Sequence, residues 1–442
     1  MCQILSHQPM ELIRKIASVV AWPHSDNLLG MYINCVSFLL MAAYVIVLPI
    51  PHTIAIRHIV FFSLLLLTLW IAWQQRMKLH LPLAWPWAFY ASVASISVIY
   101  AIDPFFSLGE VKKEVGFGVI AFLLAVSWVR SIRALSRLLA VIVASSTLMV
   151  IYSIGRAIAN DAFLTQGLIQ EGGVGGVGNL STYLITVLPF VAVYTVVSPD
   201  PHKLKRAILL FIIAIDVVAL YLTGNRAGII ALIAEIMLVL TLLVFYRTLP
   251  NVKRILVIGL VGLTLLSGVF VKHMHDRNMA VFNNAAEGMS HVSDDPRWTL
   301  WRRALQNIQD HPFIGAGFGR EVYKLRNPDM PNINDVYWHA HNIILNKGVQ
   351  MGIPGMLAFL ILLSAILYTL WKPAVEGRFS TPASKYALAG IVMLCGVVVK
   401  NMTDDFFVHD NALLFWVLVG ALIGALSGEK MTNAPRNSQA KL

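Results

Sequence analysis

Two histidines stand at the start of an otherwise apolar stretch, and their chemistry is suited to proton transfer. His339 and His341 are followed by Asn342, and then by Gly352 and Gly355. A neutral imidazole near pH 7 can accept a proton from an attacking hydroxyl group, so a histidine is a suitable general base. We expect His341 to be this base. His339 is expected to orient a substrate or bind phosphate, and a polar loop residue is the competing interpretation.

Polar residues after the histidines recur with helical spacing. Asn342, Asn346 and Gln350 are four residues apart, which places them on one face of a helix. The pattern predicts a short helix at a membrane surface that is broken from Gly352 onward. A solvated interfacial helix without a catalytic role is the alternative.

Arg226 lies in a glycine-containing turn, TGNRAG at 223–228, between two apolar runs. A guanidinium group can bind phosphate oxygens in a bidentate manner and does not lose its proton. Gly224 and Gly228 are expected to leave room for a bulky ligand. The alternative for Arg226 is a side chain that reaches the lipid headgroups as an anchor.

The composition is that of an integral membrane protein. The 442 residues have a mean hydropathy of +0.71, with 57% hydrophobic and 13% charged residues, whereas a soluble protein has about 25% charged residues. Long apolar runs predict a helical bundle and not a barrel, because backbone groups in lipid must be satisfied internally. Cys2, Cys35 and Cys395 contain no CxxC pair, so neither a disulfide framework nor a metal site is predicted.

The apolar runs predict an all-α bundle of about twelve transmembrane helices. A cytoplasmic segment at 1–27 precedes spans one to nine, which lie within 28–271. A large and partly helical outer loop occupies 272–350. Spans ten to twelve lie within 351–427, and a cytoplasmic tail follows at 428–442. The helix of the outer loop is expected to begin at Asp295-Pro296. The spans are expected near 28–48, 54–73, 82–100, 115–130, 135–155, 180–197, 205–222, 227–245, 253–271, 351–371, 385–401 and 408–427.

Loop charges predict the orientation of the spans. Most of the lysines and arginines behind the net charge of +11 lie in alternate short loops, which indicates cytoplasmic loops and not a nucleic-acid surface. An even number of spans then leaves both termini inside. The 272–350 loop, with both histidines, is therefore expected on the outer face.

Acidic residues offer alternatives to a histidine and arginine site. Asp216 and Glu235 lie within spans, where they could bond to each other, pair with Lys400 or form a proton path. We place them outside the active centre. The pairs Asp294-Asp295 and Asp404-Asp405 are expected to face outward and could hold Mg²⁺ or Mn²⁺. We predict no metal, because arginines can neutralise phosphate charge themselves.

A glycine-rich segment, EGGVGGVGN at 171–179, closes another outer loop. Glycine amides can line anion sites, but this segment lacks the lysine and hydroxyl residues of a nucleotide-binding loop. We interpret it as a flexible or re-entrant connection.

The order of these motifs resembles the O-antigen ligase family within the ligase and polymerase superfamily of lipopolysaccharide assembly. TGNRAG, DPRWTLWRRAL, HPFIGAGFG and WHAHN leading to GIPG follow one another over about 220–360. The spacing from His341-Asn342 to Gly352 and Gly355 favours the ligase. An O-antigen polymerase, an O-linked oligosaccharyltransferase and, from another class, a flippase of polyprenyl-linked glycans are the alternatives.

The resemblance implies an inverting glycosyltransferase without metal or other cofactor. The donor would be O-antigen on undecaprenyl pyrophosphate, and the acceptor would be lipid A-core. The reaction would take place at the periplasmic face of the bacterial inner membrane. The lipid bilayer is a further expected partner, and no nucleic acid is expected to bind. Arg226 and Arg297 match the family's arginines. We add Arg302 and Asn342 as substrate-binding residues.

Overall fold

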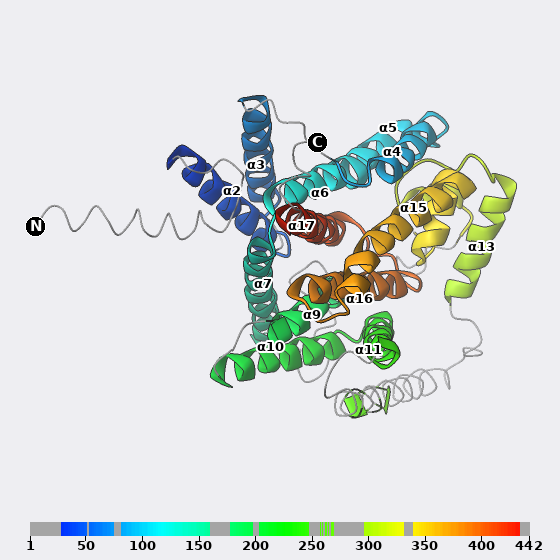
Figure 1. The fold of residues 1–442 in the computed structure, drawn as a ribbon. Helices are drawn as coiled ribbons and strands as arrows, with labels where there is room; N and C mark the ends of the chain where they lie inside the picture. The colour runs from blue at the N-terminus through cyan, green and yellow to red at the C-terminus, as the bar shows by residue number, and fades with distance from the viewer. Residues whose placement is uncertain are drawn as a thin grey trace, which may run out of the picture.

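A computed structural model of the chain describes residues 28–50, 53–74, 81–159, 177–197, 203–246, 296–330 and 339–433, together with isolated positions between 257 and 268. The regular elements within these ranges are helices (Figure 1). They are α2 (Leu28–Val47), α3 (Ile54–Gln74), α4 (Ala84–Ile99), α5 (Pro104–Glu110), η1 (Val111–Gly116), α6 (Phe117–Trp128), α7 (Ile132–Ala159), α9 (Val177–Val197), α10 (Lys203–Leu222), α11 (Arg226–Tyr246), α13 (Pro296–Asp310), α14 (Val322–Arg326), α15 (Ile343–Glu376), α16 (Pro382–Asn401) and α17 (His409–Asn433).

The predicted helical membrane protein is confirmed by the length and composition of these helices. In the described ranges, seven helices are long and apolar enough to cross a membrane, and two shorter apolar helices accompany them at Tyr32–Val47 and Ala84–Ile99. The expected span at 253–271, the segment 1–27 and the tail from 434 lie largely or wholly outside the described residues. The total of about twelve spans therefore stays a prediction.

Close helix packing in the bundle depends on small residues. In α17, a Cβ atom added at Gly420 would lie 2.5 Å from the backbone oxygen of Phe122 in α6, and one added at Gly424 would lie 2.8 Å from the backbone oxygen of Val126. Small residues of this kind let membrane helices approach closely. Helix α16 packs against α9, α11 and α15 (Figure 1), so the residues at its carboxyl end lie among several other helices.

One end of the bundle collects turns that are distant in the sequence. Asn225, between α10 and α11, bonds to Asp404, which follows α16. Asn411 of α17 bonds to Asn179 of α9. At the opposite end, a Cβ atom added at Gly428 would meet the backbone oxygen of Arg130. The start of α9, the turn between α10 and α11, and the turn between α16 and α17 therefore lie at one end of the bundle, and the turn between α6 and α7 lies at the other.

The expected break at Gly352 is present within α15. Gly352 has φ 68° and ψ −167°, which is not helical, and a Cβ atom there would lie 2.6 Å from the oxygen of Pro312. Amide groups of the 311–320 loop donate to carbonyl groups near the break. Ala316 N–H, for example, donates to Val349 O over 2.8 Å. Ile353 N–H in turn donates to Pro312 O over 2.7 Å. The break therefore leaves these backbone groups paired.

Between α4 and α6, where no element was predicted from the sequence, the chain is helical. Asp103 accepts a hydrogen bond from the backbone N–H of Phe106 over 3.0 Å, and Pro104 occupies the first helical position of α5. The same Asp-Pro signal precedes α13, which begins at Pro296 as predicted. At Asp103-Pro104 the signal starts a helix of only seven residues.

Candidate functional site

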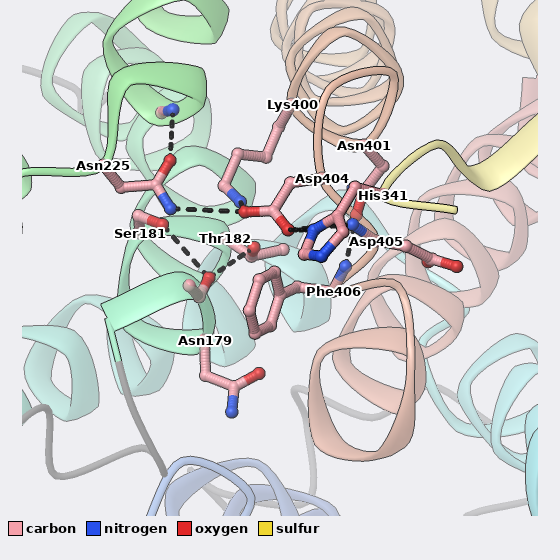
Figure 2. Close-up of polar contacts among 12 residues, drawn as sticks. Asn179, Ser181, Thr182, Asn225, His341, Lys400, Asn401, Asp404, Asp405 and Phe406 are labelled. Carbon is pink, nitrogen blue, oxygen red and sulfur yellow. Dashed lines mark hydrogen bonds and ion pairs between the residues drawn. The ribbon is translucent and has the colours of Figure 1, made fainter. Parts of the chain in front are cut away.

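The candidate site is centred on a hydrogen-bonded pair formed by His341 and Asp404 (Figure 2). His341 Nδ1 lies 3.2 Å from Asp404 Oδ1. Lys400 Nζ donates to Asp404 Oδ2 over 3.2 Å, and Asn225 Nδ2 donates to the same oxygen over 3.4 Å. Three separate segments therefore meet at one carboxylate: the start of α15, the turn before α11, and the end of α16 with the residues that follow it.

The charge state of Asp404 defines the tautomer of His341. Burial alone raises the pKa of Asp404, but Lys400 and the hydrogen bond from His341 outweigh it and hold the pKa well below its usual range. An ionised carboxylate can only accept hydrogen bonds, so Nδ1 of His341 carries the proton. Nε2 of a neutral His341 is then the ring nitrogen without a proton, which is the nitrogen that a general base uses to accept one.

His339 supports His341 from within the protein. His341 has φ 48°, which is uncommon for a residue with a side chain, and its backbone N–H donates to His339 Nδ1 over 3.0 Å. The two rings stack with their centroids 3.8 Å apart. Burial lowers the pKa of His339 well below its usual value, and His341 and Arg320 lower it further. His339 therefore stays neutral, as its acceptor role at Nδ1 requires.

The two histidines differ in accessibility. His339 is buried, whereas His341 is partly exposed. This difference favours His341 for contact with a substrate and a positioning role for His339.

Asn342 is the N-cap of α15 and not an open ligand-binding amide. Its Oδ1 accepts from the backbone N–H groups of Ile344 and Leu345, each over 3.0 Å. Its Nδ2 donates to the backbone oxygen of Met402 over 2.9 Å. Both ends of the amide are therefore engaged in joining α15 to the turn that carries Asp404.

Asp405 does not form an exposed acidic pair with Asp404, and that expectation was wrong. Both residues are buried, and the Asp405 carboxylate accepts from Asn346 Nδ2. Arg320 donates to the backbone oxygen of Asp405. Burial raises the pKa of Asp405, although Arg320 and Lys347 oppose the shift. The other proposed pair, Asp294-Asp295, lies outside the described residues.

The polar face of α15 is buried, so the solvated interfacial helix is also wrong. Lys347 Nζ contacts Glu114 of η1 over 3.1 Å and Gln350 Oε1 over 3.2 Å. The same ammonium group lies 4.5 Å from the centre of the Phe318 ring. A buried ion pair thus anchors the first turns of α15 to η1.

Two of the predicted arginines lie near this centre. Arg226 is the first residue of α11 and directly follows Asn225. Arg297, in the first turn of α13, is close enough to act electrostatically on the Lys400 ammonium group. Arg302 is exposed on α13, and the contacts among the described residues do not connect it to His341. Its neighbour Arg303 bonds to Asn327 over 2.8 Å.

The glycines of the 223–228 turn have local roles. Gly224 has φ 64°, a conformation in which glycine is favoured. A Cβ atom at Gly228 would lie 2.9 Å from Leu220 Cδ1 and 3.2 Å from Ser181 Cβ. Gly228 therefore allows α11 to pack closely on α10 and α9. The expectation that it leaves room for a ligand was wrong.

Asp216 and Glu235 are buried apart from the Lys400 ion pair. The predicted pairing of either residue with Lys400 is wrong, because Lys400 bonds to Asp404. Within the described residues, both carboxylate oxygens of Asp216 and Oε1 of Glu235 have no hydrogen-bond partner. Their position outside the active centre stays a prediction.

The sequence contained one signal for Asp404 that was not used. Lys400 lies at the end of an apolar run, and Asp404 is four residues beyond it. A cation at such a position requires a partner, and a carboxylate one helical turn away is a suitable one. Asn225 had no such signal, because only the folded chain brings it to the carboxylate.

Comparison with known proteins connects this geometry to a family. The family model described as O-antigen ligase matches residues 209–360, which include Asn225, Arg226, Arg297 and His341. Curated proteins named "Putative polysaccharide ligase" are 26% identical in Rickettsia felis and 23% identical in Rickettsia conorii, each over 53% of this chain and 55% of the relative. The chain thus spans about half the length of the curated relatives it matches. The resemblance to the O-antigen ligase family is therefore confirmed for residues 209–360 of this multi-pass membrane protein, which match that family's model.

Proposed function

We propose that this chain is an O-antigen ligase, which transfers O-antigen polysaccharide from undecaprenyl pyrophosphate to a sugar hydroxyl of lipid A-core. The observation that carries the proposal is the His341–Asp404 pair, which supplies an oriented base. The same cluster includes the turn that holds Arg226 and receives the electrostatic effect of Arg297. A base beside guanidinium groups suits attack by an alcohol on a donor with a diphosphate leaving group.

In the proposed reaction, the acceptor hydroxyl attacks the anomeric carbon while the bond from that carbon to the diphosphate oxygen breaks. His341 Nε2 takes the hydroxyl proton, and the diphosphate leaves with the electron pair of the broken bond. Arg226 and Arg297 bind its negative oxygens. Asp404 stabilises the imidazolium that forms, as the carboxylate does in a serine, histidine and aspartate triad. A single displacement inverts the anomeric carbon.

The orientation proposed for the site is periplasmic, in the bacterial inner membrane. Its residues gather at the bundle end that the predicted outer loops share. Arg130, Arg133 and Arg137 lie in and beside the turn between α6 and α7, and Gly428 packs against that turn at the other end. Basic turns favour the cytoplasmic side.

The products that accumulate in cells lacking the protein test the proposed function. Loss of a ligase is expected to leave long undecaprenyl-linked chains and a bare lipid A-core. Loss of an O-antigen polymerase would instead leave core that carries single repeat units. Analysis of both lipid pools separates these two members of the superfamily, and the second pattern would refute the ligase proposal.

Arg226→Lys is expected to lose most of the transfer activity although it keeps the positive charge. A lysine cannot reproduce the planar, bidentate contact of a guanidinium group with diphosphate. Initial rates with the undecaprenyl-linked donor measure the effect. Arg133→Lys, an exposed position in the first turn of α7, serves as the control. Equal rates for the wild type and Arg226→Lys would remove the bidentate contact from the mechanism.

A chelator is expected to leave the purified protein active. Both oxygens of Asp404 are already engaged, by His341, Lys400 and Asn225, and the proposed arginines neutralise the diphosphate. Transfer is measured before and after EDTA treatment, and again after Mg²⁺ is added. Activity that is lost with EDTA and restored by Mg²⁺ would favour a metal-dependent mechanism.

A further inference from the structure

The exposed face of α13 combines apolar and cationic side chains. Trp298, Arg302, Leu305 and Gln309 are separated by four, three and four residues, so they fall within about 60° of the helix circumference at 3.6 residues per turn. Trp298 is 61% exposed and Leu305 49% exposed. The opposite face is anchored, since Leu300, Ala304 and Ile308 are buried. The helix therefore presents this face outward while its other face packs on the protein.

The contacts of α13 with α15 place this face beside the break at Gly352, where the long apolar part of α15 begins. Ile308 packs so closely on α15 that a Cβ atom at Gly348 would lie 2.4 Å from its Cδ1 atom. Directly after α13, the bond from Ile353 N–H to Pro312 O holds the chain at the break in α15. Phe313, which follows, is 76% exposed. Its backbone carbonyl carbon would lie 2.9 Å from a Cβ atom at Gly352, next to Ile353 of α15, which is 42% exposed.

The charge of this region indicates the chemistry of its partner. Residues 297–330 contain six lysines and arginines and three acidic residues, and among these cations Arg303 and Arg320 are bonded within the protein. Arg302 lies between Trp298 and Leu305 on the exposed face. Tryptophan is enriched at membrane interfaces, and helices with basic and apolar residues on the exposed surface bind anionic lipid surfaces. A protein partner or a soluble anion would not require the continuity with the lipid-facing side of α15.

We propose that α13 lies in the outer membrane interface of the bundle and binds the phosphate of an anionic lipid headgroup through Arg302, with Trp298 and Leu305 in the apolar layer beneath. This role goes beyond glycan transfer and does not depend on it. It also accounts for Arg302 as a ligand-binding residue outside the His341 centre.

The test uses the full chain in lipid nanodiscs, with its three cysteines replaced by alanine and a fluorescent NBD group on Gln309→Cys. Emission is followed as phosphatidylglycerol replaces phosphatidylcholine. Blue-shifted emission that increases with phosphatidylglycerol is expected. Arg302→Gln should raise the phosphatidylglycerol fraction at half-maximal response about fivefold, which corresponds to roughly 1 kcal/mol for one arginine near the surface. Lys372→Gln, an exposed cation near the other end of α15, should not change it.

Further outcomes would overturn the proposal. NBD emission typical of water in every nanodisc would exclude contact with the membrane. Emission that is blue-shifted but independent of phosphatidylglycerol or of Arg302 would exclude the phosphate contact. A response of the detergent-solubilised protein to inorganic phosphate would indicate a soluble anion site, and a signal that depends on protein concentration would indicate a second copy of the chain. A label at Asp310→Cys, which is exposed but lies outside this face, should respond less. Because lipid contact is the readout, failure here is independent of any loss of ligation.

Discussion

His341→Ala is expected to reduce O-antigen transfer by a factor of about 10²–10⁴, the usual contribution of a general base. The reason is local. Without the imidazole, the acceptor hydroxyl has no group to take its proton, although the arginines can still bind the diphosphate. Transfer from an undecaprenyl-linked donor by the purified, reconstituted protein gives the rate directly.

The control for this substitution is His409→Ala, which removes an exposed histidine at the start of α17. It should retain wild-type transfer. His341→Ala must also insert and elute as the wild type does, because His341 lies within a packed turn. Wild-type ligation by a correctly inserted His341→Ala protein would eliminate the proposed base.

Asp404→Asn is expected to reduce transfer by a similar factor, on the order of 10²–10⁴. The asparagine keeps the size of the side chain but removes the negative charge that stabilises an imidazolium at His341. It also leaves the Lys400 ammonium group without its carboxylate partner in a buried position. Rate measurements should therefore be accompanied by a thermal unfolding assay in detergent.

The double variant Asp404→Asn/Lys400→Met separates the two effects. The double variant has neither charge, so no unpaired cation is left in the buried site. Replacing a buried ion pair with uncharged groups is often tolerated. We expect the stability of the double variant to recover while its transfer stays low. Asp310→Asn, at an exposed position of α13, controls for the loss of one carboxylate. Recovery of transfer in the double variant would show that Asp404 only neutralises Lys400.

The membrane helices could be predicted from the sequence because their signals are local. Apolar length, loop punctuation and Asp-Pro starts indicated the spans now seen as α3, α7, α11 and α16, and the beginning of α13. The helix break at Gly352 could likewise be predicted, because a glycine followed by Pro354 disfavours a continuous helix. These features depend on residues within a few positions of one another.

The contacts of the candidate site could not be predicted in the same way. His341 and Asp404 are 63 residues apart, and their contact exists only because α15 and α16 pack together. The turn after α16 was interpreted as exposed because it joins two spans, yet Asp404 and Asp405 are covered by the neighbouring segments. Whether a short polar turn is buried depends on which other segments of the folded chain cover it. The charge of the loop does not reveal these segments.

The distribution of the site over the sequence has a consequence for biosynthesis. Translation delivers the turn with Arg226 first, His341 later and Asp404 only with the penultimate described helix. A nascent chain therefore contains Arg226 and His341 before the carboxylate partner of this histidine has been synthesised. If the proposed mechanism holds, incomplete chains are expected to be inactive in glycan transfer without a separate inhibitor.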